Sequence, residues 1–482
     1  MLDADAQMTM MRRSPRLGEF VNMWESQVES ARGIYLSSQG LWVESERAYR
    51  KALHLLNIAF KNVQDNAKRV DELADGPRVL TDGTNTTRGY LTQISSRSLN
   101  LSEVLLQQRK LVDAEFYARE ALKLSLDNFG RNSSDVGRAL ATLSRIISEQ
   151  GRFDEALLLA KASMAAHAES GITDESRTMA VARKFYATAL VAKGQFKEAN
   201  EAFSQMMASV QKDPELVKTF NRNDLDWVMA MQKIGKGDEA FAMSEQMYQR
   251  VLKQAGKNSP RTAMVGAFHA GSLQLQGKAA EAYALYKEVT PILVDEARND
   301  AENNTASIKQ QQRTTYLYEN YLSLLAQLSQ STPANAQALA AEAFRVADMA
   351  KSSGVQRALT ASAARANISD PKLALLARKE QDLQRRVNTL SELLTGLVAA
   401  PPEQQLPSVQ AKIRQDIAAF KEEREKLKKD IAYKYPDYAE MVEPKPATIE
   451  RTRALLKPNE VLVSWYFADK EAYQRGLCMG HF

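Results

Sequence analysis

The sequence predicts an all-α protein built from repeated pairs of antiparallel helices, and two observations carry this prediction. The chain of 482 residues contains only 14 prolines and 21 glycines, while alanine, leucine, glutamine, glutamate and lysine are abundant, and this composition favours helix over sheet. One phrase also recurs along the chain, with a glycine near its start. Its copies are QGLWVESERAYRKAL (39–53), QGRFDEALLLAKAS (150–163), KGQFKEANEAFSQM (193–206), IGKGDEAFAMSEQM (234–247) and QGKAAEAYALYKEV (276–289), and QRKLVDAEFYAREAL (108–122) has Arg109 in the glycine position.

Each copy carries a small residue five positions after the glycine position, and these residues recur at a nearly fixed period. The last five are spaced by 42, 43, 41 and 42 residues. A second small residue precedes each of them by twelve positions, except in the copy where Val228 takes its place. The first set is Ser45, Ala114, Ala156, Ala199, Ala240 and Ala282, and the second set is Gly33, Ser102, Ser144, Ala187 and Ala270.

This spacing predicts where the two helices of a copy meet. Two antiparallel helices joined by a tight turn must approach closely at one point, and only small side chains allow that approach. The glycine is expected to end the first helix in the left-handed conformation. Large residues four positions after the crossing residue, such as Tyr49, Phe203 and Tyr286, are expected to fill the space toward the next pair.

The pattern resembles the tetratricopeptide repeat (TPR), in which small residues occupy these two crossing points. The standard repeat has about 34 residues, whereas the period here is near 42, and the extra residues add about one turn to each helix. The resemblance implies a TPR-like α-solenoid with six long repeats over residues 25–295. Between its first two copies, the stretch 74–89 is rich in glycine, threonine and aspartate and is predicted to be a surface loop.

The period breaks after residue 300. A helix is expected at 316–330, and in the stretch 336–366 the residues Ala340, Phe344 and Ala347 echo the second helix of a repeat. This stretch is therefore predicted to be a degenerate seventh repeat that ends the array.

Two helices that form an antiparallel hairpin are expected next, joined by the loop 398–408. Residues 371–397 carry leucines seven apart, and the return helix has one apolar face. The leucines are Leu376, Leu383, Leu390 and Leu397 with Leu373, Val387 and Leu394 on the intermediate line, and the return face is Val409, Ile413, Ile417, Phe420, Leu427 and Ile431. The expected organisation is an N-terminal segment (1–24), the repeat array (25–366), the hairpin (367–434) and a C-terminal segment (435–482).

The C-terminal segment carries a second resemblance. Its motif residues are Tyr435, Pro436, Tyr438, Ala439, Pro444, Pro446, Ala447 and Thr448, and ATIERTRALL (447–456) and the apolar stretch 460–467 follow. After long TPR-like repeats and a charged hairpin, this order resembles the entry to a CHAT domain, the caspase-like module that is associated with TPR arrays. The resemblance implies that ATIERTRALL is a short helix and that 460–467 is the first strand of a sheet.

Both faces of the expected strand are apolar, as in a central strand covered by helices. Val461, Val463, Trp465 and Phe467 would point to one side, and Leu462 and Tyr466 to the other. QRGLCMGHF (474–482) does not resemble a second strand. The chain is therefore expected to be truncated at the start of the CHAT domain, with an unpaired strand 460–467 that favours self-association.

No catalytic residue is predicted. The CHAT resemblance implies a His–Cys dyad held at strand ends, but the segments that carry it are not expected within these residues. Cys478 and His481 lie three apart in a terminal tail with no frame to orient them, and His54, His167 and His269 lie on repeat helices, where packed or surface histidines are expected. No phosphate-binding or hydrolase motif is found, and a single cysteine builds no zinc site, so no cofactor and no metal are predicted.

Charge and hydropathy narrow the class of partner. The net charge of +5 is spread over a long chain without a dense basic tract, which argues against nucleic-acid binding. No run approaches the 18 apolar residues of a membrane span, and the N-terminus lacks the apolar core of a signal peptide. A cytoplasmic location is expected, with an upstream start that adds an export signal as the alternative.

The favoured function is a protein-interaction scaffold in which the TPR superhelix binds a peptide or protein, and the chain would be the regulatory region of a CHAT-domain protein. The alternatives are a truncated caspase-like CHAT cysteine peptidase and a purely structural solenoid. First helices line the inner face of such an array, and basic groups there would pair with acidic side chains or a terminal carboxylate. The candidate partner-binding residues on this face are Arg138, Arg145, Lys184, Thr188, Met229, Gln232 and Gln274.

Overall fold

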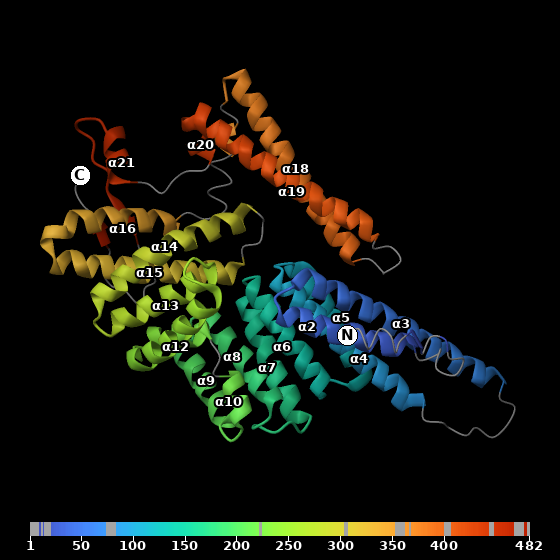
Figure 1. The fold of residues 1–482 in the computed structure, drawn as a ribbon. Coiled ribbons are helices and arrows are strands. Elements are labelled where there is room, and N and C mark those ends of the chain that lie inside the picture. The colour runs from blue at the N-terminus through green and yellow to red at the C-terminus, as the bar shows by residue number, and fades with distance from the viewer. Residues whose placement is uncertain are drawn as a thin grey trace. The chain divides into compact units, whose positions relative to one another are not determined.

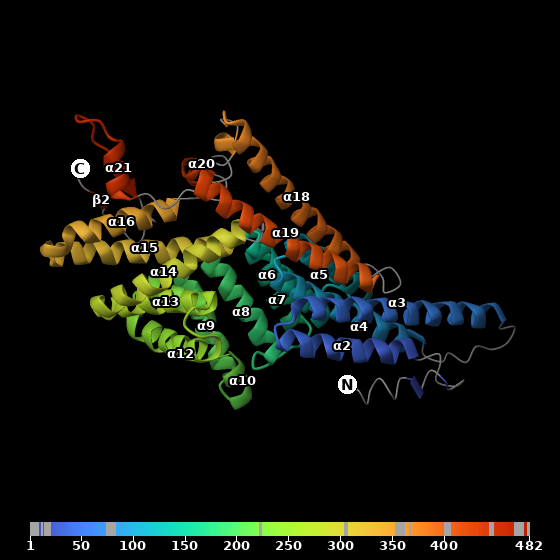
Figure 2. The ribbon, with the colours of Figure 1, turned by 45° about the horizontal axis from the view of Figure 1, so that its top comes forward.

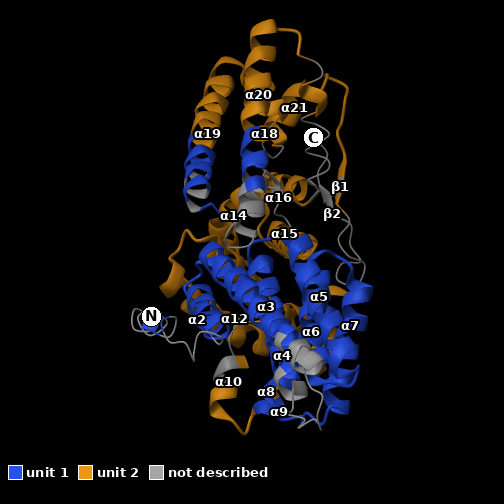
Figure 3. Ribbon diagram, turned by 90° about the vertical axis from the view of Figure 1, so that its right-hand side faces the viewer, with its two compact units in different colours: residues 1–189, 208–210, 386–419 blue, residues 190–207, 211–385, 420–482 orange. Residues whose placement is uncertain are grey.

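The structure of the chain, a computed structural model, is helical over nearly all the residues that it describes (Figure 1). These are residues 9–10, 13, 21–73, 83–220, 224–302, 307–351, 362–365, 368–399, 406–442, 448–466 and 477–479. The chain divides into two compact units, which Figure 3 shows in different colours. Unit 1 comprises residues 1–189, 208–210 and 386–419, and unit 2 comprises residues 190–207, 211–385 and 420–482.

Helix pairs with short turns follow one another in both units. The pairs of unit 1 are α2 (Val21–Ser38) with α3 (Trp42–Leu73), α4 (Gly83–Gln107) with α5 (Leu111–Phe129) and α6 (Ser134–Glu149) with α7 (Phe153–Glu169), and α8 (Arg177–Ala192) follows them. Unit 2 continues with α9 (Phe196–Val210), α10 (Pro214–Phe220), α11 (Leu225–Lys233), α12 (Gly237–Ala255), α13 (Pro260–Leu275), α14 (Ala279–Glu302), α15 (Ile308–Ser331), the short 3₁₀ helix η2 (Pro333–Asn335) and α16 (Ala336–Lys351).

The predicted crossing residues are confirmed. All six residues of the first set are fully buried, and the residues twelve positions earlier, Val228 included, are buried with them. In two pairs the crossing is closed by a hydrogen bond, because Ser45 Oγ donates to the carbonyl of Gly33 at 2.8 Å and Ser144 Oγ donates to that of Ala156 at 2.7 Å. At Gly33 an added Cβ would lie 2.8 Å from the ring of Tyr49, so the glycine makes room for this ring within its own helix pair.

The expectation of one close approach per pair is wrong, because the structure shows a second one, seven residues farther from the turn on each helix. Ser26 Oγ donates to the carbonyl of Ala52 at 2.8 Å in the first pair, and Ser163 Oγ donates to that of Gly137 at 2.6 Å in the third. A Cβ at Gly137 would lie 2.6 Å from the ring of His167. The two antiparallel helices of a pair therefore stay in contact over about two turns, and small residues are needed at both points of close approach.

The predicted left-handed turns are also confirmed. The glycine positions have φ between 73° and 81°. The backbone nitrogen of the residue after the glycine donates a hydrogen bond to a carbonyl of the last helical turn, from Arg152 to Ile147 and from Lys278 to Leu273. These are the bonds of the Schellman helix end. Arg109, which replaces the glycine in one copy, adopts the same conformation with φ 62°.

Replacing Arg109 with glycine is expected to raise the free energy of unfolding by about 0.5–1 kcal/mol, because a residue with a Cβ is strained at positive φ. The ion pair lost with Glu149 is long, at 3.8 Å, and partly exposed, so its loss subtracts little. Urea unfolding of the two proteins measures the change. Gly151→Arg, the reverse exchange at the same place in the next pair, should destabilise the protein, and a loss of stability in Arg109→Gly would contradict this account.

The predicted surface loop 74–89 needs a correction. Residues 74–82 lie outside the described residues, but 83–89 form the first turns of α4. Glycine and threonine disfavour a helix only by fractions of a kcal/mol to about 1 kcal/mol each, and the packing of α4 against α3 and α5 outweighs that preference.

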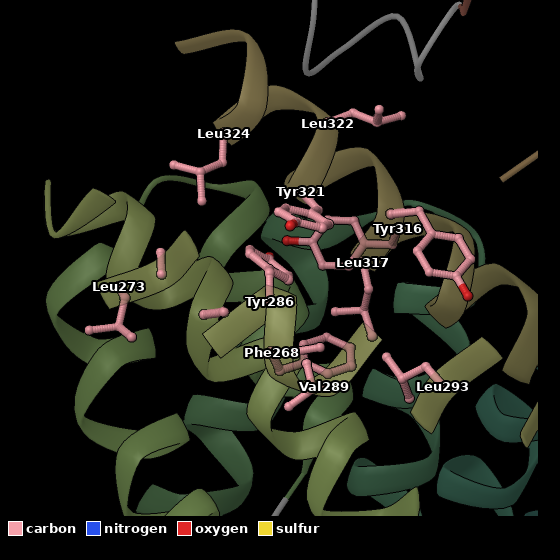
Figure 4. Packing of buried hydrophobic residues seen from close by; sticks show 14 of the residues in the cluster. Phe268, Leu273, Tyr286, Val289, Leu293, Tyr316, Leu317, Tyr321, Leu322 and Leu324 are labelled. Atoms are coloured by element: carbon pink, nitrogen blue, oxygen red, sulfur yellow. The ribbon is translucent and has the colours of Figure 1, made fainter. Parts of the chain in front are cut away.

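One apolar core runs through the pairs of unit 2. Helices α13, α14, α15 and α16 lie side by side (Figures 1 and 2), and their buried residues form a continuous cluster in which the rings of Tyr286 and Tyr321 stack with centroids 4.7 Å apart (Figure 4). The helix predicted at 316–330 is present but begins earlier, at Ile308. In α16, Ala347 is buried as expected, whereas Ala340 and Phe344 are only partly buried and Leu339, Ala343 and Val346 form the buried stripe with it.

The hairpin consists of α18 (Pro371–Ala399) and α19 (Pro407–Lys434). Its part in unit 2 is held by the apolar cluster of Leu373, Ala377, Leu383, Leu427 and Ile431 and by two ion pairs between the helices, Arg424 with Glu380 at 2.7 Å and Lys379 with Glu423 at 2.8 Å. These ion pairs join the two helices in this part of the predicted hairpin. Val409 is exposed, and residues 400–405 of the predicted loop lie outside the described residues.

The C-terminal segment begins with two short helices, α20 (Pro436–Val442) and α21 (Ile449–Leu455). Tyr438 packs into the hairpin cluster, and Thr448 caps α21 by accepting a hydrogen bond from the nitrogen of Arg451. The predicted helix in ATIERTRALL is therefore confirmed. Pro444, Pro446 and Ala447 lie outside the described residues.

The prediction of an unpaired strand is wrong. Only β1 (Ser464–Tyr466) is a strand within 460–466, and it pairs antiparallel with β2 (Leu477–Met479), with Trp465 opposite Cys478. Val461, Leu462 and Val463 are exposed, so they are not part of a covered central strand. The pairing of β1 with residues that follow in sequence satisfies backbone groups, and Tyr466 packs against the core of unit 2.

Candidate functional site

The predicted basic residues of unit 1 are already paired within the chain. Arg138 forms an ion pair with Asp135 of its own helix at 2.8 Å. Arg145 pairs with Glu103 of α4, and its guanidinium lies 5.7 Å from the centre of the Phe185 ring. Lys184 is half-buried and Thr188 is buried. Both arginines therefore have carboxylate partners within the chain.

The predicted residues of unit 2 are brought together, but they face other helices of the chain. Met229 packs against the core cluster, and Gln274 Nε2 lies 3.5 Å from Ser323 Oγ. Gln232 is buried with its whole amide engaged, since Nε2 donates to the carbonyl of Phe268 at 2.7 Å and Oε1 accepts from Tyr316 at 2.9 Å. Gln232 therefore does not line an open surface in this structure, contrary to its prediction as a partner-binding residue.

Of the three histidines predicted to be packed or surface side chains, two are buried. His167 is buried, and burial followed by the charge of Arg138 lowers its pKa. His269 is buried between the rings of Phe241 and Tyr248, and its Nδ1 lies 3.1 Å from Ser244 Oγ. Burial also lowers the pKa of His269, since the charged form of a buried imidazole is disfavoured.

Cys478 and His481 are not shown as a catalytic pair. Cys478 lies in β2, where the structure describes the backbone, and His481 lies outside the described residues. Among the described residues, no cluster of histidine, cysteine, aspartate and glutamate has the arrangement of a metal site, and no helix is long and apolar enough to cross a membrane.

The structure shows a groove that the sequence analysis missed. It opens between α3 and α5 over α4, and its volume is about 410 Å³. Its apolar floor is formed by Leu53 of α3 and by Ile94 and Leu101 of α4. The ring of Phe116, at its edge, is 57% exposed. The lining residues are Arg50, Leu53, His54 and Asn57 of α3, Ile94, Ser98 and Leu101 of α4, and Phe116, Tyr117, Glu120 and Leu124 of α5.

A buried charge cluster fixes one end of this groove. Glu46 is fully buried, and it accepts hydrogen bonds from Arg50 at 3.0 Å, from Gln108 at 2.8 Å and from Lys110 at 2.7 Å. Arg50 in turn donates to the hydroxyl of Tyr117 at 2.6 Å. Because these bonds join α3 to α5 and to the turn before it, the two walls of the groove are held at a fixed separation.

A sequence signal for the groove does exist. Phe116 stands two positions after its crossing alanine, on the outward side of the second helix, and Leu158 stands at the same place in the next copy. The other copies have Arg47, Glu201, Ala242 and Ala284 there. A large apolar residue at an otherwise polar or small position suggests a contact surface, and both side chains are exposed.

No protein-family model matches the chain, and no curated protein matches it. Among solved structures, two forms of a protein from Podosopora anserina with nearly identical TPR-like repeats, described as a candidate kinesin light chain, share 19% and 20% identity with the chain, and each covers 43% of it with 98% of its own length at a TM-score of 0.33. BtubC (BKLC) from P. vanneervenii is 15% identical over 51% of the chain and 92% of its own, also at a TM-score of 0.33.

The repeats of the chain have a TPR-like fold. Small residues are buried at the two crossing positions, and left-handed turns join the paired helices, as in such repeats.

Proposed function

We propose that this chain is a protein-interaction scaffold and that the groove between α3 and α5 binds a helical segment of a partner protein. The observation that carries the proposal is the groove itself, with an apolar floor, the exposed ring of Phe116 at its edge and walls fixed by the Glu46 cluster. Arrays of this kind commonly bind peptides along their surfaces.

The shape of the groove favours a peptide helix. Its lining residues recur on successive turns of two neighbouring helices, from Arg50 to Asn57 on α3 and from Phe116 to Leu124 on α5, a length of about two helical turns or roughly 10 Å. An apolar stripe of a partner helix would pack on Ile94, which is partly exposed, and on the exposed ring of Phe116, as in other helix-in-groove complexes. His54, Asn57 and Glu120 stand where polar residues of that helix would make hydrogen bonds.

Peptide selection tests this function. Helical peptides selected by display against the purified protein should lose binding at least about tenfold on Phe116→Glu, because the charge would be buried under the ligand. Leu158→Glu is the matched control, since Leu158 is 68% exposed at the equivalent position of α7 and does not line the groove. Selected peptides that bind all three proteins equally would refute the assignment of the site.

We further propose that the chain is the regulatory region of a CHAT-domain protein. The order of α20, the capped helix α21 and β1 after the hairpin supports this relation, together with the residues Tyr435, Pro436, Tyr438, Ala439 and Thr448. The alternative is a truncated caspase-like cysteine peptidase. Peptide cleavage by the purified protein that disappears in Cys478→Ala would favour the peptidase, and cleavage unaffected by that change would not.

A further inference from the structure

Arg97 of α4 occupies a position of the repeat that is apolar in the other described copies. It precedes its crossing residue, Ala114, by 17 positions. The residues at the same distance in the other described copies are Val28, Ala139, Ala182 and Val265. The last three of these are buried, and Arg97 is buried as well, with 7% of its surface exposed. A charged side chain therefore stands where the fold otherwise places small or aliphatic core residues.

The guanidinium of Arg97 has no carboxylate partner among the described residues. Nη1 donates to the carbonyl of Gln93 at 3.2 Å, and Nε is buried without an acceptor. An arginine side chain stays charged in proteins, so the cost of its burial is not relieved by loss of the proton. Buried charges are as a rule paired, and Arg50, which is buried on α3, lies 2.9 Å from the carboxylate of Glu46. The contrast indicates that Arg97 lacks the group that would balance its charge.

The free part of this guanidinium has a definite shape. Because Nη1 is engaged by Gln93, the edge that remains is formed by Nε and Nη2, whose two parallel N–H groups match the two oxygens of a carboxylate. Tyr49 of α3 is close enough to interact with the charge, since burial raises the pKa of Tyr49 to about 12 and Arg97 opposes part of that rise. Tyr49 is therefore neutral near pH 7, and its hydroxyl does not supply the missing negative charge.

We propose that Arg97 anchors a binding site for a small carboxylate anion, which pairs with the edge formed by Nε and Nη2. The anion balances the buried charge and gives Nε the acceptor that it lacks. It must be small, because only 7% of the surface of Arg97 is exposed. This inference goes beyond the groove between α3 and α5, because Arg97 is not one of the residues that line that groove and the ligand is an anion and not a helix.

Formate, the smallest carboxylate, is the probe. The Tm of the full chain should be higher in sodium formate than in sodium chloride at the same ionic strength, because a ligand that binds only the folded state stabilises it. Arg97→Met keeps a long side chain and removes the charge, so formate should no longer raise the Tm. Arg97→Lys keeps the charge without the paired N–H groups and should bind formate at least about tenfold more weakly. Arg138→Met is the matched control, since Arg138 already pairs with Asp135, and it should keep the full effect of formate.

Calorimetric titration of formate into the unaltered protein gives a second test that does not depend on how well the variants fold, and saturable binding at one site is expected. No saturable binding, or an equal rise in Tm for the unaltered protein and Arg97→Met, would overturn the proposal and leave Arg97 a structural residue. A larger effect of inorganic phosphate than of formate at equal ionic strength would overturn the assignment of the ligand as a carboxylate.

Discussion

Replacing Asp226 with asparagine is expected to lower the free energy of unfolding by about 3–5 kcal/mol. The change keeps the shape of the side chain and removes its charge, so Lys309, which is 5% exposed, and Arg313 lose their carboxylate. Removing one partner of a buried ion pair leaves the other charges uncompensated in a poorly hydrated place, which accounts for a loss of this size. Urea unfolding followed by circular dichroism and tryptophan fluorescence measures the change.

Two control variants separate this effect from a general sensitivity to charge. Glu422→Gln breaks an ion pair with Lys426 on α19 that is largely exposed, and no measurable change is expected. The triple variant Asp226→Leu/Lys309→Met/Arg313→Met replaces the whole cluster with apolar side chains, and it should recover most of the lost stability, because such replacements are often neutral or stabilising. Unchanged stability in Asp226→Asn would contradict the account of this cluster.

The same cluster predicts how stability depends on pH. Burial alone would raise the pKa of Asp226, but the charges and hydrogen bonds of Arg313 and Lys309 hold it below its ordinary value of 3.8. The folded protein thus binds a proton there less readily than the unfolded chain does. The stability that Asp226 contributes is fully present above its unfolded pKa and is lost as the pH falls through the lower folded pKa. The difference in stability between the unaltered protein and Asp226→Asn should therefore be constant from pH 7 to 5 and shrink at lower pH.

The crossing residues could be predicted from sequence because they reflect local geometry. Ala156 must be small because it lies against Ser144 of the preceding helix, to which a short turn joins it. The same constraint recurs in each copy, so the spacing of small residues is enough to reveal it. Arg109 could be placed in a left-handed turn for the same reason, although an arginine by itself favours no such conformation. The outward position of Phe116 carried a signal too, but only a comparison of the copies makes it visible.

The contacts of Gln232 and Asp226 could not be predicted in this way. Asp226 meets Lys309 and Arg313, which lie more than eighty residues later, and no periodic pattern links these positions. Whether a polar residue of a first helix faces solvent or another helix depends on how closely its neighbours approach, and here Gly271 decides it. The partner of β1 was missed because strands of three residues carry almost no pattern.

Replacing Ala156 with leucine is expected to lower the free energy of unfolding by about 3 kcal/mol. Ala156 is fully buried at the crossing of α6 and α7, and its carbonyl accepts a hydrogen bond from Ser144 Oγ at 2.7 Å. Three additional carbons would force the two helices apart, and such overpacking typically costs about 1–3 kcal/mol. The value at the upper end is expected because the second close contact, between Ser163 and Gly137, would be disturbed by the same displacement. Denaturant unfolding measures the change.

The matched control is Ala168→Leu, the same substitution on the same helix at an exposed position. Leucine has a helix propensity close to that of alanine, so this change should alter stability by less than about 0.5 kcal/mol. A difference in the free energy of unfolding between the two variants therefore measures the cost of overpacking at the helix crossing and not a change in the helix propensity of α7. If both variants were equally stable, the helices could separate at Ala156 without cost, and small residues at a fixed spacing would no longer explain why the chain folds into repeated helix pairs.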